Sequence, residues 1–410
     1  MTCRNISLRR SPFRLMAGML FFSLALIGTA LPAFAQTSWR VEVVDDGSGT
    51  DAGMYSSLAL DRNGNFQIAY FNSSRRTLQY AFREKHDEKW SKMAVASEAG
   101  MYVSLVDDAQ GLPHMAFNSP LKAGLQYAHW DGKKWHLQVI DNIATSFGTS
   151  IQLDAQGNPH VAYFQLTHLS GIKSGDANGQ RLKYAYSDGT TWFTKTVALR
   201  PRQGRFNSLA IDSAGAAHIA FAQSGHLQYA TWDGTSWQYE EVDSTSAADD
   251  AAGLGLSMVL DPAGDPQLSY FDAAKRTLKY AYRKAGVWKT EVIQELPGTP
   301  RYPDSTSIKL DAKNLPRVAY YDSGSGVLKY AVADGKKWTV EIVDQKGVVG
   351  LFPSLCLDAS GQPYISYYDS TNKQLRLAHP GASAAALPAT GPPAATAPAP
   401  AAPAAKPEKN

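Results

Sequence analysis

Cysteine is almost absent from this chain of 410 residues, which contains only Cys3 and Cys356. Cys3 lies in an N-terminal segment that we expect to be removed, so a single cysteine would remain. One thiol can form neither an internal disulfide nor a thiolate-rich metal site. Cys356 lies in the apolar stretch SLCLD, where we expect a small buried side chain.

The chain also lacks an excess of charge of either sign. It has 40 Lys and Arg residues against 37 Asp and Glu residues. Four arginines, and no acidic residue, lie within the first 35 residues, so that 36 basic and 37 acidic residues remain beyond them. A nearly neutral chain has no overall field for nucleic acid or an anionic membrane surface. We therefore expect no nucleic-acid partner.

Signatures of common enzyme classes are missing. The sequence has no glycine-rich phosphate loop, no His-Glu-x-x-His and no Gly-x-Ser-x-Gly. Three histidines, His114, His160 and His218, share one repeat position, where a semi-exposed polar side chain is favoured over a metal ligand. The segment DRNGN, which begins at Asp61, resembles a calcium loop but lacks the later bidentate glutamate. We therefore assign no catalytic set, no metal and no cofactor.

No apolar run is long enough to span a membrane comfortably; the longest is Met16–Ala30. A basic pair, Arg9 and Arg10, precedes this run, and the small-x-small sequence that ends at Ala35 follows it. This order is typical of a secretory signal. We predict a signal peptide over residues 1–35, cleaved after Ala35, and a secreted or periplasmic protein without a membrane span in the mature chain.

The other end of the chain has a different composition. Residues 380–410 are rich in Ala and Pro and contain almost no large apolar side chain, which predicts a disordered tail. The segment Leu387–Gly391, LPATG, resembles a sortase motif, but neither a hydrophobic stretch nor a basic end follows it. Between the two ends, residues 36–379 are predicted to form one domain.

This domain repeats one unit seven times, and self-similarity of this length indicates a repeat architecture. In each unit a Ser is followed four residues later by Asp, and nine residues after the Asp by Tyr or Phe. The repeated serines are Ser57, Ser104, Ser150, Ser208, Ser257, Ser307 and Ser354. A Leu-led segment and a Trp complete the unit, and the tryptophans are Trp39, Trp90, Trp135, Trp192, Trp237, Trp288 and Trp338.

Each unit contains four short segments rich in β-branched and aromatic residues, bounded by turn sequences. Asp-Gly pairs such as that in DGKKW suit hairpins that need a positive φ. Four antiparallel strands in about 49 residues make one propeller blade. Trp39 begins a fourth strand with no partner before it, and the last unit lacks a fourth strand. The sequence therefore predicts an all-β, seven-bladed β-propeller of four-stranded antiparallel blades, closed by the N-terminal strand in blade seven.

These repeats resemble secreted bacterial propellers of the sialidase-like and lectin-like kinds across about residues 37–379, at the level of architecture. The segment Ser187–Trp192, SDGTTW, is similar to the sialidase Asp-box Ser-x-Asp-x-Gly-x-Thr-Trp, although its Asp and Gly are adjacent. For a sialidase, the resemblance implies three arginines around a carboxylate, an acid/base Asp, and a Tyr nucleophile with its own carboxylate. No motif in this sequence brings such residues together.

The spacing of the repeats indicates which face carries function. The spacing from Asp to Tyr or Phe is nine residues in every unit, but Trp to the next Ser ranges from 14 to 20. The spacing from Tyr or Phe to the next Leu ranges from 6 to 19. In an antiparallel blade both variable connections fall at one end, and rigid scaffolds usually carry function on such loops. We therefore predict that the site lies on the irregular loop face.

Candidate ligand-binding residues on that face fall into three groups. The aromatic group either stacks on sugars near the central channel or caps the core: Tyr55, Tyr102, Phe206, Tyr302 and Phe352. The acidic group either accepts sugar hydroxyls or caps turns: Asp272, Asp322 and Asp369. The cationic group either binds an acidic substituent or is solvated: Arg76, Arg205 and Arg301. An insertion at residues 165–180 is either a lid over the channel or a passive loop.

These observations favour a secreted, non-enzymatic propeller that binds a glycan, or an extracellular or cell-envelope protein, through its loop face. Several weak sites on one rigid disc would gain affinity by avidity. The alternative is a sialidase-like, glycan-active hydrolase or lyase with one central pocket, and a third possibility is a structural scaffold. An enzyme needs one asymmetric set of residues, whereas a lectin tolerates repeated sites.

Overall fold

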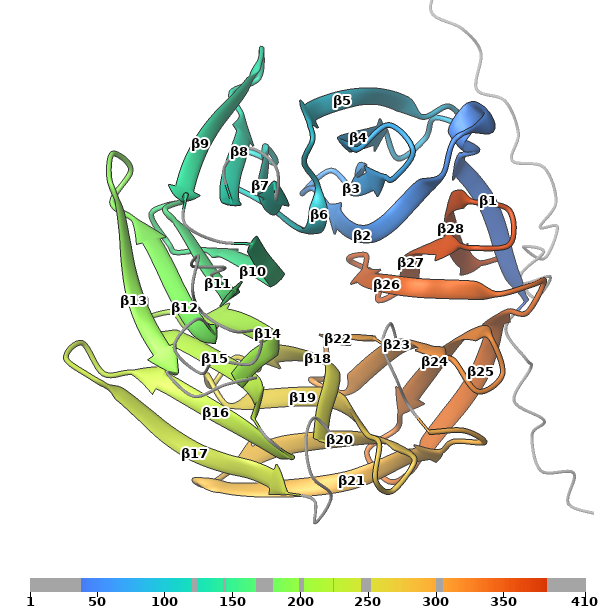
Figure 1. Ribbon diagram of the computed structural model, residues 1–410. Helices are drawn as coiled ribbons and strands as arrows, with labels where there is room; N and C mark the ends of the chain where they lie inside the picture. The colour runs from blue at the N-terminus through green and yellow to red at the C-terminus, as the bar shows by residue number, and fades with distance from the viewer. Residues whose placement is uncertain are drawn as a thin grey trace, which may run out of the picture. The chain divides into compact units, whose positions relative to one another are not determined.

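The computed structural model describes residues 38–119, 124–142, 145–166, 180–198, 203–223, 225–244, 252–299 and 305–381. Within these ranges, 28 strands form seven four-stranded sheets arranged around a ring (Figure 1). The predicted all-β, seven-bladed propeller is therefore confirmed. The predicted signal peptide, nearly all of the predicted tail and most of the insertion at 165–180 lie outside the described residues.

The first four blades follow one another along the chain. Blade 1 comprises β2 (Ala52–Leu60), β3 (Phe66–Asn72), β4 (Thr77–Arg83) and β5 (Ser91–Ser97). Blade 2 comprises β6 (Met101–Asp107), β7 (Pro113–Ser119), β8 (Gly124–Trp130) and β9 (Trp135–Asp141). Blade 3 comprises β10 (Thr145–Leu153), β11 (Pro159–Leu166), β12 (Gln180–Ser187) and β13 (Trp192–Ala198). Blade 4 comprises β14 (Gln203–Ile211), β15 (Ala217–Gln223), β16 (His226–Trp232) and β17 (Trp237–Ser244).

The remaining three blades complete the ring. Blade 5 comprises β18 (Ala252–Leu260), β19 (Pro266–Asp272), β20 (Thr277–Lys284) and β21 (Val287–Glu295). Blade 6 comprises β22 (Thr306–Leu310), β23 (Pro316–Asp322), β24 (Val327–Ala333) and β25 (Trp338–Asp344). Blade 7 comprises β26 (Val349–Leu357), β27 (Pro363–Asp369), β28 (Gln374–Pro380) and the N-terminal β1 (Trp39–Asp45). A 3-10 turn, η1 (Gly47–Gly49), connects β1 to blade 1.

The ring is closed by pairing between the two ends of the domain. Strand β1 runs antiparallel to β28, with a register from Trp39 opposite Pro380 to Asp45 opposite Leu375. The predicted closure by the N-terminal strand is confirmed. Because strands from both ends share one sheet, the ring cannot open without breaking that sheet.

Two tight turns define one end of every blade, which we call the hairpin face. In the first turn of blade 1, Asp61 Oδ1 accepts hydrogen bonds from the amides of Asn63 and Asn65, both at 2.8 Å. Gly64 supplies the left-handed residue of this turn, with φ at +79°. The connections whose length varies most from blade to blade lie at the opposite end, which we call the loop face.

The repeated serine joins neighbouring blades. In each of the seven interfaces, its Oγ accepts a hydrogen bond from a backbone amide in the innermost strand of the next blade. The distances are 2.9 to 3.3 Å, and the donors are Leu58, Leu105, Ile151, Leu209, Met258, Ile308 and Leu355. The serine is therefore a structural residue that holds the ring together around its axis.

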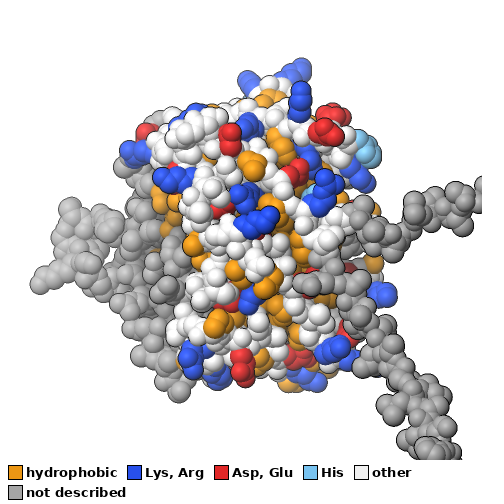
Figure 2. All heavy atoms as spheres, turned by 90° about the vertical axis from the view of Figure 1, so that its right-hand side faces the viewer, with side chains coloured by type: hydrophobic (Ala, Val, Ile, Leu, Met, Phe, Trp, Pro, Cys, Tyr) orange, Lys and Arg blue, Asp and Glu red, His pale blue; other side chains and the backbone are white. Residues whose placement is uncertain are grey.

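The repeated tryptophan joins blades farther from the axis. At six interfaces its ring meets, edge to face, a tyrosine on the third strand of the preceding blade, with centroids 5.2 to 5.5 Å apart. At the seventh interface Leu377 replaces the tyrosine, and Trp90 instead contacts Phe66 and the Arg83 guanidinium. The outermost strands expose single apolar side chains such as Val41 and Val43, and the outer surface mixes them with charges of both signs (Figure 2).

Candidate functional site

A small cavity opens on the loop face where the innermost strands begin, and we call it the central cup. Its volume is about 280 Å³. Tyr55 of β2, Tyr102 of β6 and Phe352 of β26 line one side of it. The ring of Tyr55 lies 4.4 Å from that of Tyr102 and 4.5 Å from that of Phe352, between centroids. Three aromatic residues from adjacent blades therefore form one continuous wall.

The backbone holds these rings in an unusual conformation. Tyr55, Tyr102 and Phe352 have φ values of 55°, 55° and 53°. Blades 3 and 5 place Gly148 and Gly255 at the equivalent position, with φ values of 56° and 54°. A left-handed backbone costs a side-chain-bearing residue on the order of 1 kcal/mol, and glycine avoids that cost. Three blades thus retain an aromatic residue where the backbone favours glycine, which is the kind of strain found at functional sites.

A local irregularity produces this conformation. The pairing of β2 with β3 slips between Met54 and Ser57, and that of β26 with β27 slips between Leu351 and Ser354. Such a bulge bends the strand and redirects a side chain. Tyr55 and Phe352 each lie within one of these bulges.

The other side of the cup is small and polar. Asn207 Nδ2 donates to the carbonyl of Gly148 at 2.7 Å, and Thr306 Oγ1 donates to the carbonyl of Gly255 at 2.9 Å. Asn207 Oδ1 and Ser305 Oγ have no hydrogen-bond partner among the described residues. The cup therefore has an aromatic wall that faces a wall of amide and hydroxyl groups.

The other predicted aromatic residues are not part of this wall. Phe206 lies on β14 and packs against the cores between blades 4 and 5 and between blades 5 and 6. Its contacts are those of a residue that caps the core. Tyr302 and Arg301 lie outside the described residues, and so does the side chain of Arg205.

The three predicted aspartates are buried at the second-strand ends, with exposed fractions of 0 to 2%. Each caps the turn that follows by accepting a backbone amide at 3.0 Å; the residues are Asp272, Asp322 and Asp369. Cations also reach them, as Lys329 Nζ lies 2.8 Å from Asp322 and Arg376 lies 2.7 Å from Asp369. These carboxylates contact protein groups and do not line the cup.

Arg76 lies in a turn on the loop face, with half of its side chain exposed, and its guanidinium is 2.9 Å from Glu98. An exposed pair of this kind contributes little to stability. Arg76 does not line the cup.

One set of contacts between blades, the tyrosine–acid pairs, was not predicted from the sequence; in one of them Gln takes the place of the acid. In five interfaces the repeated Tyr donates its hydroxyl hydrogen to an Asp or Gln at the end of the preceding fourth strand; the tyrosines are Tyr70, Tyr163, Tyr270, Tyr320 and Tyr367. Where the repeat has Phe117 or Phe221, the equivalent fourth-strand position is Ala96 or Ala198. In the sequence, Tyr therefore occurs together with Asp or Gln, and Phe together with Ala. This coupled variation could have revealed the contact.

These pairs do not form nucleophiles. Burial raises the pKa of Tyr163 well above its usual range, and the Asp141 carboxylate beside it raises it further. Lys183 Nζ lies 2.6 Å from the same carboxylate. A sialidase-type tyrosine would need access to substrate, but Tyr163 is fully buried. The cluster is an interblade contact.

The three histidines of the shared repeat position also have structural contacts. His160 Nδ1 lies 2.5 Å from the Tyr184 hydroxyl and Nε2 lies 3.5 Å from Asp154. His114 and His218 form the same chain with the tyrosine and aspartate of their own blades. Within the described ranges, no group of three or more His, Cys, Asp or Glu residues has the arrangement of a metal site. In the same ranges, no helix has the length and apolar character to cross a membrane.

No protein-family model matches the chain, and no curated protein matches it. Solved structures do. An ulvan lyase from a new polysaccharide lyase family is 12% identical with a TM-score of 0.53, covering 82% of this chain and 95% of that one. A mutant of AofleA from Arthrobotrys oligospora is 13% identical with a TM-score of 0.50, covering 75% and 90%. A Hadza microbial sialidase is 12% identical with a TM-score of 0.47, covering 77% and 73%.

Identities this low show the fold alone. One fold hosts many activities, so the fold does not select an activity for this chain. The chain is a seven-bladed propeller with an architecture-level resemblance to known propellers, as the sequence predicted, and the ulvan lyase shares that architecture.

Proposed function

We propose that the protein is a non-enzymatic binding propeller that recognises a glycan through the central cup of its loop face. The observation that carries this proposal is the wall formed by Tyr55, Tyr102 and Phe352, which are held in left-handed backbone where other blades have glycine. Tyr55 also packs against the core between blades 1 and 2, but strained backbone conformations of this kind cluster at functional sites. A ligand that stacks on the rings supplies a reason for that strain.

The shape of the cup fits a single sugar ring. Its volume of about 280 Å³ lies near the lower limit of small-molecule sites. Aromatic faces stack on the apolar face of a sugar, while the amide and hydroxyl wall around Asn207 and Ser305 meets its hydroxyl groups. Aromatic and polar walls on opposite sides therefore match a ligand that has both kinds of surface.

The chemistry of the cup favours binding over hydrolysis. None of the described residues that line it is Asp, Glu, His, Lys or Arg. Glycoside hydrolysis uses a pair of carboxyl groups at the scissile bond. The aspartates predicted from sequence cap turns, and the tyrosine–acid pairs are buried between blades.

We also propose that the protein acts outside the cytoplasm, where glycans and cell-envelope proteins are available as partners. The support is the order of basic residues, apolar run and Ala33-Phe34-Ala35 near the N-terminus. Secretion from the source cell would yield a chain that begins at Gln36, and mass spectrometry of the exported protein tests this directly.

The test of binding is a glycan array probed at high density with the labelled protein. A single shallow site near 1 mM is worth only about 4 kcal/mol, so dense display is needed for detection. We expect saturable binding that free sugar displaces. A blank array, or hydrolysis of the bound glycans during the assay, would contradict the proposal.

A further inference from the structure

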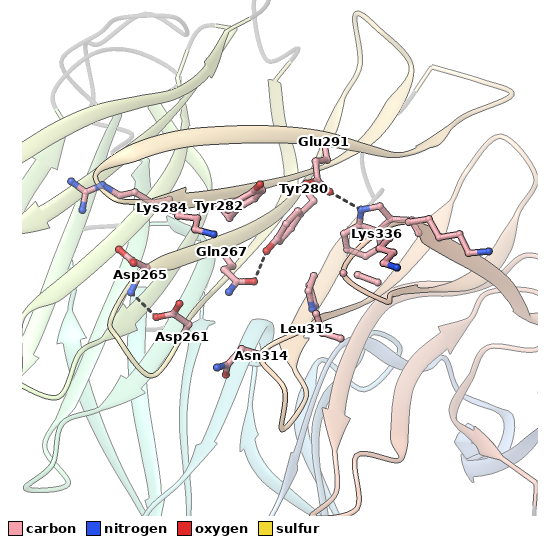
Figure 3. Close-up of a pocket in the computed structure, with 16 residues that line it drawn as sticks. Asp261, Asp265, Gln267, Tyr280, Tyr282, Lys284, Glu291, Asn314, Leu315 and Lys336 are labelled. Atoms are coloured by element: carbon pink, nitrogen blue, oxygen red, sulfur yellow. Dashed lines mark hydrogen bonds between the residues drawn. The ribbon is translucent and has the colours of Figure 1, made fainter.

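A second cavity lies on the hairpin face, between blades 5 and 6, and we call it the blade 5–6 groove. Its volume is about 540 Å³. Blade 5 contributes strands β19 and β20 with the turn at Asp261, and blade 6 contributes the turns at Asn314 and Gly335 (Figure 3). Because these turns belong to the hairpin face, the groove opens on the face opposite the central cup.

In other blades, a long side chain at the position of Gln267 reaches the turn aspartate and so fills the floor of the equivalent space. In blade 3, His160 links the hydroxyl of Tyr184 to the turn residue Asp154. In blade 6, Arg317 reaches the turn residue Asp311. Each of these long side chains uses the second carboxylate oxygen of the turn aspartate.

Blade 5 lacks this bridge. Gln267 accepts a hydrogen bond from the Tyr280 hydroxyl through Oε1, at 2.5 Å, and it is 8% exposed. Asp261 Oδ1 accepts the amides of Ala263 and Asp265 at 2.9 Å. Gln267 Nε2 and Asp261 Oδ2 have no partner among the described residues, although both residues line the groove.

The comparison with blade 1 shows why Gln267 is left with an available donor. There Gln67 makes the same bond with Tyr80, and its Nε2 donates to the carbonyl of Gly111 in blade 2 at 2.9 Å. The residue of blade 6 that corresponds to Gly111 is Asn314, to which Gln267 does not donate. The floor of the blade 5–6 groove therefore presents one unused amide donor and one unused carboxylate acceptor.

The walls of the groove add aromatic surface and positive charge. Tyr282 and Trp338 line it, and Trp338 is fixed by a hydrogen bond from its Nε1 to Glu291 at 3.2 Å. Lys284 and Lys336 lie at its rim (Figure 3), and neither forms an ion pair with a described residue. These groups supply a stacking surface and further hydrogen-bond donors.

We propose that the blade 5–6 groove binds a saccharide unit with two adjacent hydroxyl groups. One hydroxyl donates to Asp261 Oδ2 and its neighbour accepts from Gln267 Nε2, since hydroxyl groups serve in both roles. The ring lies against Trp338 or Tyr282, and the lysine ammonium groups contact the outer oxygens. This site lies on a different face from the central cup and does not depend on it, so a protein with both sites can crosslink glycans.

The test follows the indole N–H signal of Trp338 by NMR while methyl glycosides are added at millimolar concentrations. The Trp338→Phe variant assigns that signal. We expect a saturable shift with a glycoside that has the adjacent hydroxyls, and about tenfold weaker binding of the matching deoxy sugar. No shift with any glycoside would overturn the proposal.

The Gln267→His variant gives the decisive comparison. It removes the amide donor and introduces the bridge of blades 2, 3 and 4, which occupies Asp261 Oδ2 while keeping the contact with Tyr280. The expected result is a folded protein whose Trp338 signal no longer responds, and an unchanged response would overturn the proposal. Asp261→Asn keeps the turn cap but replaces the acceptor with a donor, so it serves the same purpose if the histidine variant misfolds.

A cup variant separates this inference from the proposed function. Replacing Tyr55, Tyr102 and Phe352 with glycine should leave the Trp338 response unchanged. Loss of the response in that variant would overturn the independence of the two sites. A retained groove response together with a cup that binds nothing would contradict only the proposed function.

Discussion

Asp107 is a charged residue in a position that other repeats fill with apolar residues. The equivalents are Leu60, Leu153, Ile211, Leu260, Leu310 and Leu357. Both carboxylate oxygens of Asp107 are buried and have no hydrogen-bond partner among the described residues. Burial, reinforced by the carboxylates of Asp61 and Asp108, raises the pKa of Asp107 to about 7.

Replacing Asp107 with Leu should stabilise the protein above neutral pH. The folded pKa of about 7 exceeds the ordinary value of 3.8, so the wild-type protein binds more protons when folded and loses stability as pH rises between these values. We expect Asp107→Leu to raise the free energy of unfolding at pH 8 by about 2–4 kcal/mol. Urea unfolding across pH measures this, with Asp107→Asn as the uncharged control. Identical pH profiles for wild type and Asp107→Asn would contradict the assignment.

His160 makes the opposite prediction for acid. Burial lowers the pKa of its imidazole below the ordinary 6.5, despite the nearby Asp154. A lowered histidine pKa gives stability that is present above 6.5 and lost as pH falls toward the folded pKa. Gln67 and Gln267 accept the tyrosine hydroxyl at this position in other blades, so His160→Gln should retain the fold. We expect its unfolding midpoint to fall less than that of wild type between pH 7 and pH 5; an equal fall would refute the role of His160.

Among the strands, the residues that contact one another between two blades vary together from interface to interface. Asp141, Tyr163 and Lys183 meet between blades 2 and 3, with contacts of 2.7 Å and 2.6 Å to the carboxylate. The interface between blades 1 and 2, where the repeat has Phe117, has Ala96 and Gln126 in the corresponding places. Each set satisfies its own groups. The first contains a buried carboxylate together with its hydroxyl and ammonium partners, and the second contains no carboxylate and neither of those partners.

Mixed sets should be unstable. Asp141→Ala alone leaves the Tyr163 hydroxyl and the Lys183 ammonium without their acceptor, and we expect a loss of about 2–4 kcal/mol. The triple change Asp141→Ala, Tyr163→Phe and Lys183→Gln recreates the natural alternative set and should recover most of that loss. Chemical denaturation of the single and triple variants measures the coupling. A triple variant that is less stable than the single variant would show that the three residues do not act as a set.

The strands, their turns and the closure of the ring were predictable from the sequence because each depends on local patterns. Asp61 and Gly64 mark a turn by their own chemistry, and Trp39 marks the unpaired fourth strand. Contacts between blades were less accessible. The hydrogen bond that the Leu105 amide donates to Ser57 Oγ joins residues 48 positions apart, and only the three-dimensional arrangement of the repeats reveals it.

At the scale of the whole molecule, the candidate site was predictable only in part. The sequence pointed to the start of the innermost strands, and the structure brings Tyr55, Tyr102 and Phe352 together there. The sequence did not distinguish Phe206 from these three residues, although Phe206 packs against two core clusters and does not line the cup. The blade 5–6 groove was missed because it arises from a bridge that Gln267 does not make, and a missing contact leaves no motif.

If the cup binds glycan through its aromatic wall, removal of that wall must abolish binding, and a paired glycan array measures this. The wild-type protein is compared with a variant in which Tyr55, Tyr102 and Phe352 are replaced by glycine, the residue that Gly148 and Gly255 supply in other blades. Relief of backbone strain offsets lost ring contacts, so we expect the free energy of unfolding to change by no more than about 1 kcal/mol. When Gln267→His is added to both proteins to silence the blade 5–6 groove, we expect sugar-competable binding to disappear from the folded cup variant. Undiminished binding of the same glycans by the folded cup variant would contradict binding through the aromatic wall.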